Sequence, residues 1–365
     1  MAVAVDALPH RVGLGWRKPL APGILTHLDR VDVVEVMAED LFDAPRAELS
    51  AMKTLSRQLP VVVHGLSLGL ASGARTDPKR LSKLAKVVEQ LAPDFWSEHL
   101  AFVRSDGLEI GHLAAPPRCA ETLDGLFRNV NTAARVSGAR PLLENIATLI
   151  TPAGSTLDEA EFVSSALEAA DADMLLDLHN LYANSQNFGF DPYAFLERMA
   201  PERIRAVHLA GGRWIRGSAG QRRLLDDHLH PVPDELYRML SWVAERATRP
   251  LTVIIERDGR YPAFQELLLE VERAREALRV TPLVRAPGKS APRAAARNAA
   301  SAQLEAYLAR LYVDSALRQR FIADREALLA AAQLDFGTRA ALQNVDVSEL
   351  ELAAHSYEHK RSQRR

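Results

Sequence analysis

The chain has very little cysteine, because Cys119 is the only one among its 365 residues. An internal disulfide is therefore excluded, and a metal site built from several thiolates, such as an iron–sulfur cluster, is excluded as well. Cys119 stands just before a predicted helix without an evident activating neighbour, so we interpret it as a buried apolar residue.

Long apolar runs are also missing. No stretch approaches the roughly eighteen apolar residues that a membrane-spanning helix needs. The first twenty residues lack the charged start and the apolar run of a secretory signal. We therefore expect a cytoplasmic protein that has no membrane partner.

A strong charge of either sign is absent, since the formal net charge is -2. Residues 1–280 carry -6 and residues 281–365 carry +4. Nucleic-acid-binding domains usually display a strongly basic surface, so we expect no nucleic-acid partner. The acidic excess of the larger part fits an ordinary solvated surface or a cation-binding pocket.

Short apolar runs recur along the chain, and longer stretches with helical spacing lie between them. Runs such as VVVH and TVIIE are continuously apolar, which is typical of parallel strands buried on both faces. The eight predicted strands are Arg11–Leu14, Val31–Met37, Pro60–His64, Phe95–Phe102, Pro141–Glu144, Asp173–Leu178, Ile204–Leu209 and Leu251–Glu256. Amphipathic helices are predicted at Pro78–Leu91, Cys119–Ser137, Leu157–Ala170 and Pro233–Ala247.

This alternation predicts an α/β fold, a (β/α)₈ TIM barrel. An open doubly wound sheet is the alternative, but the glycine-rich phosphate loop that would favour it is missing after the first strand. We expect a catalytic barrel at residues 1–280, a Pro/Ala/Arg-rich linker at 281–300 and a small all-helical module at 301–365. The module begins with a stripe of leucines, has Asp314 and Asp324 as N-cap residues and ends in a helix at Val347–Lys360. About sixty residues bury little core, so it should dock on the barrel or on a partner.

Residues able to bind metal ions stand at the ends of six predicted strands and in the loop after the seventh. The C-terminal face of a barrel gathers such side chains around one axis. The expected ligands are His64, His99, Glu144, Asp177, Asn180, His208, Asp226, His228 and Glu256.

Each of these residues alone would be read as a hydrogen-bonded structural residue; their convergence favours metal ions. Four carboxylates in one pocket would repel one another unless cations neutralised them, and neutral imidazoles would add ligands without adding charge. Oxygen and imidazole donors without thiolate suit iron, manganese or zinc.

The segments VVVHG, SEHLAF, LLLENI, LLDLHN, VHLAGG, DDHLHPVPD and IIERDG resemble those of the methanobactin biosynthesis protein B-like family, the multinuclear non-haem iron oxidases. The resemblance covers residues 10 to 275. It implies that the nine ligands hold two or three irons in mixed-valent form, with Asp226 and His228 also in catalytic roles. It further implies dioxygen-dependent oxidation of cysteine residues in a ribosomally made peptide, or of a related thiol. A small partner protein or leader-peptide-binding domain is expected to take part.

Two positions depart from the pattern of that family. His179 stands where the family usually has Asn, and Gly212 stands where it often has His. These changes bear on the substrate and on the surroundings of the ligands more than on the metal. The segments LYVDSALRQRF and AAHSYEHKR also resemble a C-terminal module of actinobacterial-type members.

Several other polar residues lie near the expected ligands in the sequence. Arg213 and Arg216 are candidate substrate-binding residues in a lid that could hold an anionic peptide, and a solvated loop is the alternative. His230 is expected to make a loop contact or a hydrogen bond to a ligand residue. Glu35 and Glu39 are expected either to accept hydrogen bonds from ligand residues or to be exposed.

Two other functions use the same residue types. A zinc-dependent endonuclease IV-like phosphodiesterase or a xylose isomerase-like enzyme would place similar sets on the same strands. Endonuclease IV-like chains usually have His where Asn180 stands, and a DNA enzyme should be more basic. A non-catalytic metal-binding scaffold is the second alternative.

Overall fold

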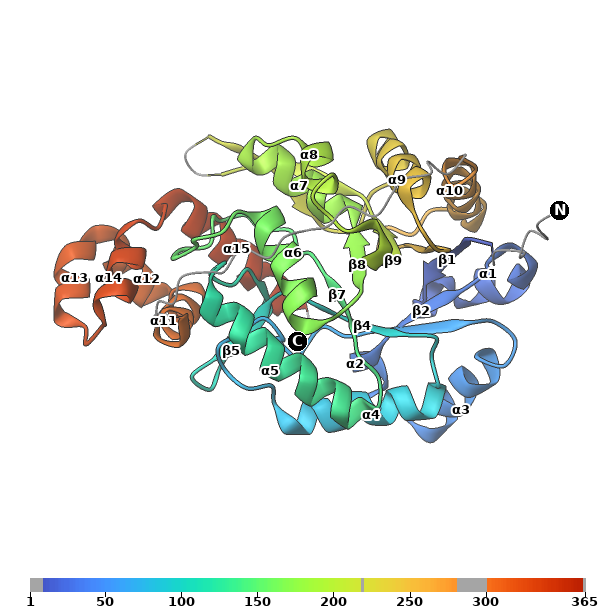
Figure 1. Ribbon diagram of the computed structural model, residues 1–365, viewed down its shortest axis with the longest axis horizontal. Coiled ribbons are helices and arrows are strands. Elements are labelled where there is room, and N and C mark those ends of the chain that lie inside the picture. The colour runs from blue at the N-terminus through green and yellow to red at the C-terminus, as the bar shows by residue number, and fades with distance from the viewer. Residues whose placement is uncertain (1–8, 218–219, 281–300, 364–365) are drawn as a thin grey trace.

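The computed structural model describes residues 9–217, 220–280 and 301–363. Eight parallel strands close into a barrel in the order β1-β12-β9-β8-β7-β4-β3-β2, and helices surround it (Figure 1). The predicted TIM barrel is therefore confirmed. Its strands are β1 Arg11–Gly15, β2 Val34–Met37, β3 Val61–His64, β4 Trp96–His99, β7 Leu142–Glu144, β8 Met174–Asp177, β9 Ile204–Leu209 and β12 Thr252–Ile255.

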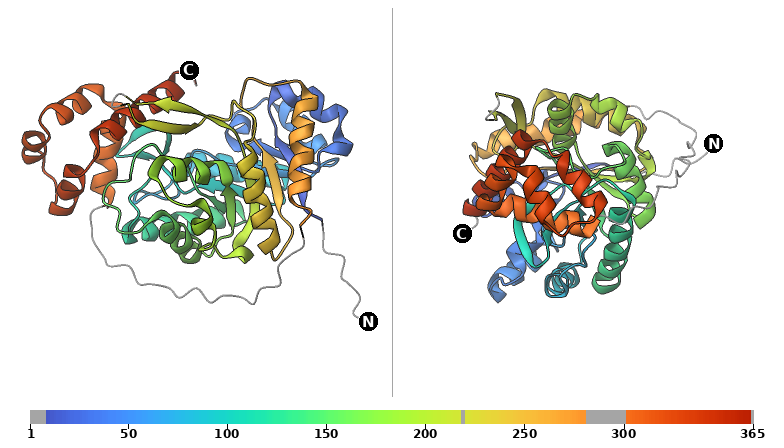
Figure 2. Two further views of the ribbon diagram at one scale, coloured as in Figure 1. Left: turned by 90° about the horizontal axis from the view of Figure 1, so that it is seen from above. Right: turned by 90° about the vertical axis from the view of Figure 1, so that its left-hand side faces the viewer.

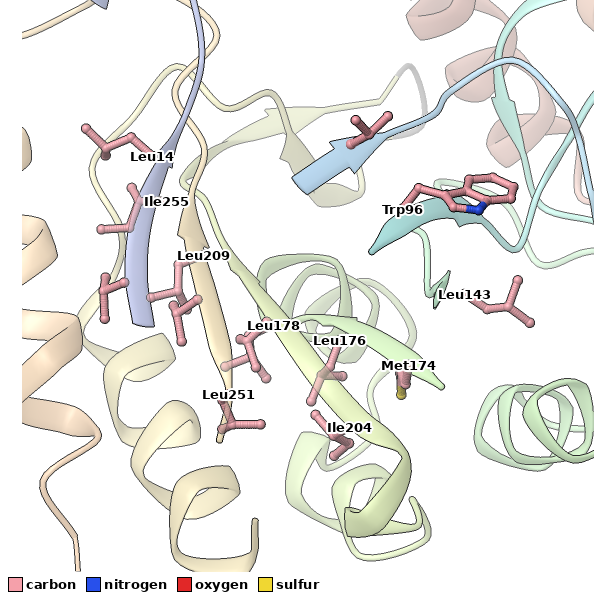
Figure 3. Packing of buried hydrophobic residues seen from close by; sticks show 14 of the residues in the cluster. Leu14, Trp96, Leu143, Met174, Leu176, Leu178, Ile204, Leu209, Leu251 and Ile255 are labelled. Carbon is pink, nitrogen blue, oxygen red and sulfur yellow. The ribbon is translucent and has the colours of Figure 1, made fainter. Parts of the chain in front are cut away.

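Two layers of apolar side chains hold the barrel together. The outer layer joins strands to helices, and Figure 3 shows members of it such as Leu14, Leu176 and Ile255. The inner layer fills the barrel and is a separate cluster, made of Val33, Val62, Phe95, Leu142, Leu175, Ala206 and Ile254. Because side chains alternate along a strand, each strand contributes to both layers, and this explains why the runs are continuously apolar.

Local signals in the sequence fix the ends of the surrounding helices. Asp77 caps α4 with Pro78 in its first turn, and Asp158 caps α6 in a reciprocal pair with Glu161. The helices around the barrel are α1 Ala21–Thr26, α2 Ala38–Leu41, α3 Arg46–Leu55, α4 Pro78–Leu91, α5 Ala120–Ser137, α6 Glu159–Ala170, α7 Leu178–Phe188, α8 Pro192–Leu196, α9 Asp234–Arg246 and α10 Phe264–Ala277.

Two antiparallel hairpins interrupt the barrel pattern, and the sequence reading missed both. The strand expected at Phe95–Phe102 ends at His99, and a hairpin of β5 Phe102–Ser105 and β6 Leu108–Ala114 follows it. The segment expected to be a lid or a solvated loop forms a second hairpin, β10 Gly212–Arg216 and β11 Arg222–Asp226.

The C-terminal helices lie at one end of the barrel, beside these hairpins (Figures 1 and 2). They are α11 Ser301–Val313, α12 Ser315–Ala323, α13 Arg325–Ala331, α14 Phe336–Gln343 and α15 Val347–Gln363. Asp314 and Asp324 cap α12 and α13 as expected. The predicted linker at 281–300 lies outside the described residues, and the division into domains stays a prediction.

These helices share an apolar core with the barrel's loops. Phe102 and Ile110 of the first hairpin and Ile150 of the loop after β7 pack with Leu308 of α11 and Tyr357 of α15. The C-terminal helices therefore dock on the barrel, and most of their large apolar side chains are covered, although Phe336 of α14 is exposed.

No helix among the described residues combines the length and the apolar character needed to span a membrane.

Candidate metal centre

The strand period places the predicted ligands in one layer above the inner apolar cluster. His64 comes two positions after Val62, Asp177 two after Leu175 and Glu256 two after Ile254, so each faces the barrel axis like its apolar predecessor. The same spacing applies to Glu35, Ser97, Glu144 and His208. The sequence thus builds an apolar floor and a polar layer on it.

Glu144 lies at the centre of this layer. Its Oε2 is 3.3 Å from His64 Nε2 and 3.1 Å from His99 Nε2. Its Oε1 is 3.2 Å from His208 Nδ1, which is also 3.2 Å from Glu256 Oε2. One carboxylate therefore connects three of the predicted histidines.

The far nitrogens of these histidines have fixed partners. His64 Nδ1 lies 2.8 Å from Ser97 Oγ, and His99 Nδ1 donates to the Gly65 carbonyl at 3.1 Å. His208 Nε2 lies 2.8 Å from Glu35 Oε2. Each imidazole thereby turns its other nitrogen towards Glu144, as metal-binding histidines do. Of the two alternatives expected for Glu35, the structure shows a buried hydrogen-bond acceptor beside His208 and not an exposed carboxylate.

Asp177 uses its two oxygens differently. Oδ1 accepts the backbone N–H of Asn180 at 2.7 Å and caps α7, while Oδ2 is buried without a hydrogen-bond partner. Asn145 exchanges hydrogen bonds with the backbone N–H and carbonyl of Asp177, both at 2.9 Å. Asn145 also accepts through its own carbonyl from Asn180 Nδ2 at 3.0 Å, so the Asn180 amide keeps Oδ1 free as a donor atom for a cation.

Several predicted ligands have a buried side-chain atom without a hydrogen-bond partner. Such atoms are costly unless something else satisfies them. Among the described residues they include Glu144 Oε2, Asp177 Oδ2, Asn180 Oδ1, His208 Nδ1 and His228 Nε2. All five are atoms that can donate an electron pair to a cation, so the residues present fit a metal centre.

The donor atoms fall into overlapping groups of three, each within 4.8 Å of one another. Each group shares at least one residue with another, which is the arrangement of a centre with several ions. The groups are His64, His99 and Glu144; Glu35, His208 and Glu256; Glu144, Asp177 and His208; and Asp177, His228 and Glu256.

The electrostatics of the cluster favour positive charge. Burial and the neighbouring Glu144 and Asp226 raise the pKa of Asp177 well above its usual range. Burial would lower the pKa of His99, but Glu144 and Glu98 outweigh it and raise that pKa to about 9. At these two residues the metal-free cluster favours the protonated form, whereas burial and the neighbouring histidines lower the pKa of His64. Cations can supply positive charge in place of protons.

Asp226 and His228 form the more open edge of the cluster. His228 Nε2 lies 2.9 Å from Asp226 Oδ2, and the two side chains are 18% and 16% exposed, whereas the other predicted ligands are at most 6% exposed. A substrate can therefore reach the centre from the side of this pair.

The two departures from the family pattern meet in space. His179 is fully buried, and its Nδ1 lies 2.8 Å from Asp226 Oδ1. A Cβ on Gly212 would lie 2.6 Å from His179 Cε1 and 2.2 Å from the Leu225 carbonyl oxygen. Only glycine at 212 leaves room for the imidazole, so the two unusual residues depend on each other.

The remaining candidates lie around the centre. Arg213 and Arg216 are exposed on β10, and Arg213 pairs with Asp227 at 3.1 Å. His230 Nδ1 is 2.9 Å from Asp227 and belongs to none of the metal-type groups of the described chain. Glu39 accepts from the Leu66 N–H at 3.0 Å.

Cys119 is buried beside Thr122, and burial raises the pKa of its thiol. This agrees with the interpretation of Cys119 as a buried apolar residue.

Sequence reasoning did not single out Ser97 or Asn145. Ser97 could have been found, because it stands two positions before His99 and must share its face of β4. Asn145 follows Glu144, and its side chain hydrogen-bonds the backbone of Asp177 on the neighbouring strand β8. No periodic pattern in the sequence indicates that contact.

Comparison with known proteins identifies the family. A family model described as RiPP precursor modification enzyme MbnB/TglH/ChrH matches residues 11–279, where RiPP denotes a ribosomally synthesised and post-translationally modified peptide. The chain belongs to this family. The resemblance seen in the motifs is therefore confirmed, and the family is one of peptide-modifying enzymes.

Curated relatives agree with this assignment. A UPF0276 protein of Streptomyces avermitilis is 36% identical over 273 residues, which are 73% of this chain and 54% of the relative, so this chain spans about half of that protein's length. UPF0276 proteins of Caulobacter vibrioides and of Anaeromyxobacter sp. are 30% and 31% identical, and the matches cover 72% and 76% of this chain and 92% and 95% of those relatives.

Solved structures resemble the chain more weakly. D-psicose 3-epimerase with D-fructose has a TM-score of 0.47 at 13% identity and covers 73% of this chain and 96% of its own. Endonuclease IV from Thermus thermophilus has a TM-score of 0.47 at 18% identity, with coverages of 73% and 98%.

Proposed function

We propose that this protein is a multinuclear non-haem iron oxidase that modifies cysteine residues of a ribosomally made peptide. The observation that carries the proposal is the set of buried donor atoms without hydrogen-bond partners, which belong to five of the predicted ligands. Family membership supports a peptide as the substrate.

Nine residues would hold two or three irons, namely His64, His99, Glu144, Asp177, Asn180, His208, Asp226, His228 and Glu256. Bound iron would supply the activation of dioxygen and the one-electron oxidation of a carbon beside the cysteine sulfur. Oxygen and imidazole donors fit iron, and they fit zinc or manganese as well, so the metal must be measured.

The chain's own residues would prepare the site for this chemistry. The apolar floor below Glu144 excludes water from the closed side of the centre. On the open side, Asp226 and His228 would serve the reaction by binding the ion nearest to the peptide, because both side chains are partly exposed. Arg213 and Arg216, both exposed on β10, would bind carboxylates of that peptide.

The C-terminal helices are a candidate site for the leader of the peptide or for a small partner protein. They dock on both hairpins, and β11 ends at Asp226 on the open side of the centre. A peptide that reaches Asp226 would therefore pass close to α15.

The experiment begins with protein expressed in iron-supplemented medium and purified without oxygen. Elemental analysis, Mössbauer spectroscopy and electron paramagnetic resonance should show two or three irons per chain with a coupled signal. A cysteine-containing precursor peptide encoded near this gene, mixed with the protein and dioxygen, should then change in mass.

Glu144→Gln and Glu159→Gln make a matched pair of variants. Glu144 is buried and Glu159 is mostly buried, but Glu159 bonds to Arg118 and Asn184 away from the cluster. We expect Glu144→Gln to lose iron and activity while Glu159→Gln keeps both. Stoichiometric zinc without iron would favour a hydrolase instead, and a chain that retains no metal would refute the proposal.

A further inference from the structure

His228 differs from the other predicted histidine ligands in how it is supported. His64, His99 and His208 belong to barrel strands and are almost fully buried. His228 lies in the loop after β11, is partly exposed and has a left-handed backbone with φ of 55°. The positive φ strains the backbone of a residue that is not glycine, and packing in the core does not fix this side chain. His228 therefore needs specific contacts to keep one orientation.

Asp258 supplies these contacts at two points. Its backbone N–H donates to the carbonyl of His228 at 3.0 Å, which holds the unusual backbone. Its Oδ2 lies 3.0 Å from His228 Nδ1. Main chain and side chain of His228 are therefore both held by one residue, which follows β12 and stands two positions after Glu256.

Arg17 holds Asp258 in turn. Its Nε and one terminal nitrogen lie 2.7 Å and 2.6 Å from Asp258 Oδ1, and its other terminal nitrogen donates to the Trp16 carbonyl at 2.9 Å. Since Oδ1 is used by the guanidinium, Oδ2 is left as an acceptor for His228. An acceptor at this place requires the proton of the imidazole to sit on Nδ1.

The consequence appears at the opposite nitrogen. His228 Nε2 faces Asp226 Oδ2 at 2.9 Å, so a cation that replaces the proton between these two atoms would bind Nε2. We propose that Asp258, anchored by Arg17, is a positioning residue that fixes the Nδ1–H form of His228 and thereby makes its Nε2 a metal ligand. The inference rests on the proposed metal centre and concerns the ion at its open edge.

The chain contains a natural control for this arrangement. Asp227 also lies between a histidine and an arginine, with His230 Nδ1 at 2.9 Å and Arg213 Nε at 3.1 Å. Its histidine, however, is outside the metal-type groups found among the described residues. Asp258→Asn and Asp227→Asn thus make the same chemical change in two similar settings.

The test is a titration of metal-free full-length protein with zinc against a chromophoric chelator, with bound zinc counted by elemental analysis. The amide of Asp258→Asn can donate to Nδ1 and so favours the imidazole form with its proton on Nε2, which cannot bind a cation. We expect one ion to bind about 10- to 100-fold more weakly and the others to keep the wild-type affinity. Asp227→Asn should match the wild type.

Arg17→Gln tests the anchor and serves as a second variant. It should weaken the same ion by a smaller factor, and combining it with Asp258→Asn should add nothing, because Arg17 acts through Asp258. Additive losses would overturn the role of Arg17.

Other outcomes separate this inference from the proposed function. Wild-type affinities in Asp258→Asn would overturn the inference and leave the metal centre standing. Equal weakening of all ions, together with a lower unfolding temperature of the metal-free variant, would show a purely structural role and overturn it as well. A wild-type chain that binds no zinc and no iron would overturn both.

Discussion

Asp177 shows at the scale of one residue how a candidate ligand is held. One oxygen caps α7 and the other is left without a partner. The cap fixes the side chain, so the free oxygen costs stability until a cation binds it. In the metal-free protein, the same free oxygen that prepares Asp177 to bind a cation therefore lowers the stability of the fold.

Asp177→Asn should separate these two effects. Burial and the negative charges around Asp177 raise its pKa, so the folded metal-free chain holds a proton there that the unfolded chain has lost at pH 8. This penalty grows as the pH rises, and asparagine does not carry it. We expect the metal-free variant to have a higher free energy of unfolding than the metal-free wild type at pH 8.

The stability order of the two proteins should reverse after metal is added, because Asp177→Asn lacks one of the charged side chains that would bind it. Denaturant unfolding with and without zinc measures both halves of this prediction. A variant that is less stable than the wild type in both states would contradict it.

The gathering of the candidate ligands in one layer was predictable from the sequence because these residues end strands. His64, Glu144 and Glu256 close apolar runs, and the period of two then fixes the face on which they lie. Asp258 and Arg17 were not predictable in the same way. They come from loops that follow β12 and β1, and only closure of the barrel brings them together.

Among the elements, α11 joins the barrel through a buried carboxylate. Glu305 is fully buried, and its oxygens accept from Ser72 Oγ at 2.7 Å and from the Gly73 N–H at 3.0 Å. Burial raises the pKa of Glu305 to about 7. The folded state therefore favours the protonated acid, and the stability that this proton provides is lost as the pH rises from about 4.5 to about 7.

Glu305→Gln should remove this pH dependence. Relative to the wild type, the variant should gain about 3 kcal/mol between pH 5 and pH 8, since glutamine stays neutral at both. Denaturant unfolding at the two pH values gives the difference, and Glu326→Gln on the exposed side of α13 is the control. A constant difference between Glu305→Gln and the wild type would show that Glu305 is charged throughout.

The helix α15 holds the hairpin that ends at Asp226. Arg223 of β11 pairs with Glu349 at 2.9 Å, and Lys360 Nζ lies 3.4 Å from the Asp226 carbonyl oxygen. Figure 2 shows the hairpin running from the barrel towards this helix. The position of Asp226 therefore depends on the C-terminal helices.

Glu349→Gln keeps an acceptor for the Thr151 N–H but removes the charge that faces Arg223. We expect hydrogen exchange of the β11 amides to speed up by about 3- to 30-fold, which corresponds to about 0.6–2 kcal/mol. Glu358→Gln, on an exposed position of the same helix, should leave β11 exchange unchanged. Equal exchange in all three proteins would mean that the pair does not restrain the hairpin.

The hairpins themselves could not be found by periodicity. The strand β10 mixes Arg213, Trp214 and Arg216 on faces that are both largely exposed, so no apolar alternation marks it. Its pairing with β11 depends on the partner strand, which lies beyond an intervening turn. The segment therefore has the composition of a loop.

At the scale of the whole molecule, the C-terminal helices are not part of the barrel fold, but they share an apolar core with its loops. Alternation of strands and helices predicted the barrel, because each unit follows a local rule. The place where the helices dock could not be predicted, since Phe102 and Ile110 belong to a hairpin that the sequence did not reveal.

A chain that ends at residue 280 should expose this shared core. Phe102, Ile110, Leu149 and Ile150 are buried against the C-terminal helices and would face water. We expect the shortened protein to bind a hydrophobic dye and to associate at higher concentration in analytical ultracentrifugation. A chain ending at residue 363 should behave as the full chain does. A monomeric, dye-free shortened barrel would show that the hairpin covers its own apolar face.

The closure of the barrel also sets the order in which the protein can assemble during synthesis. The first barrel strand pairs with the last, with Arg11 opposite Thr252. One edge of β1 therefore stays unpaired while roughly 240 residues are synthesised. At typical rates of translation this takes about 10 to 50 s. During that time the half-built sheet has open edges that a chaperone would need to shield. The C-terminal helices are made after the barrel, and they add to it when its layer of candidate ligands is already complete.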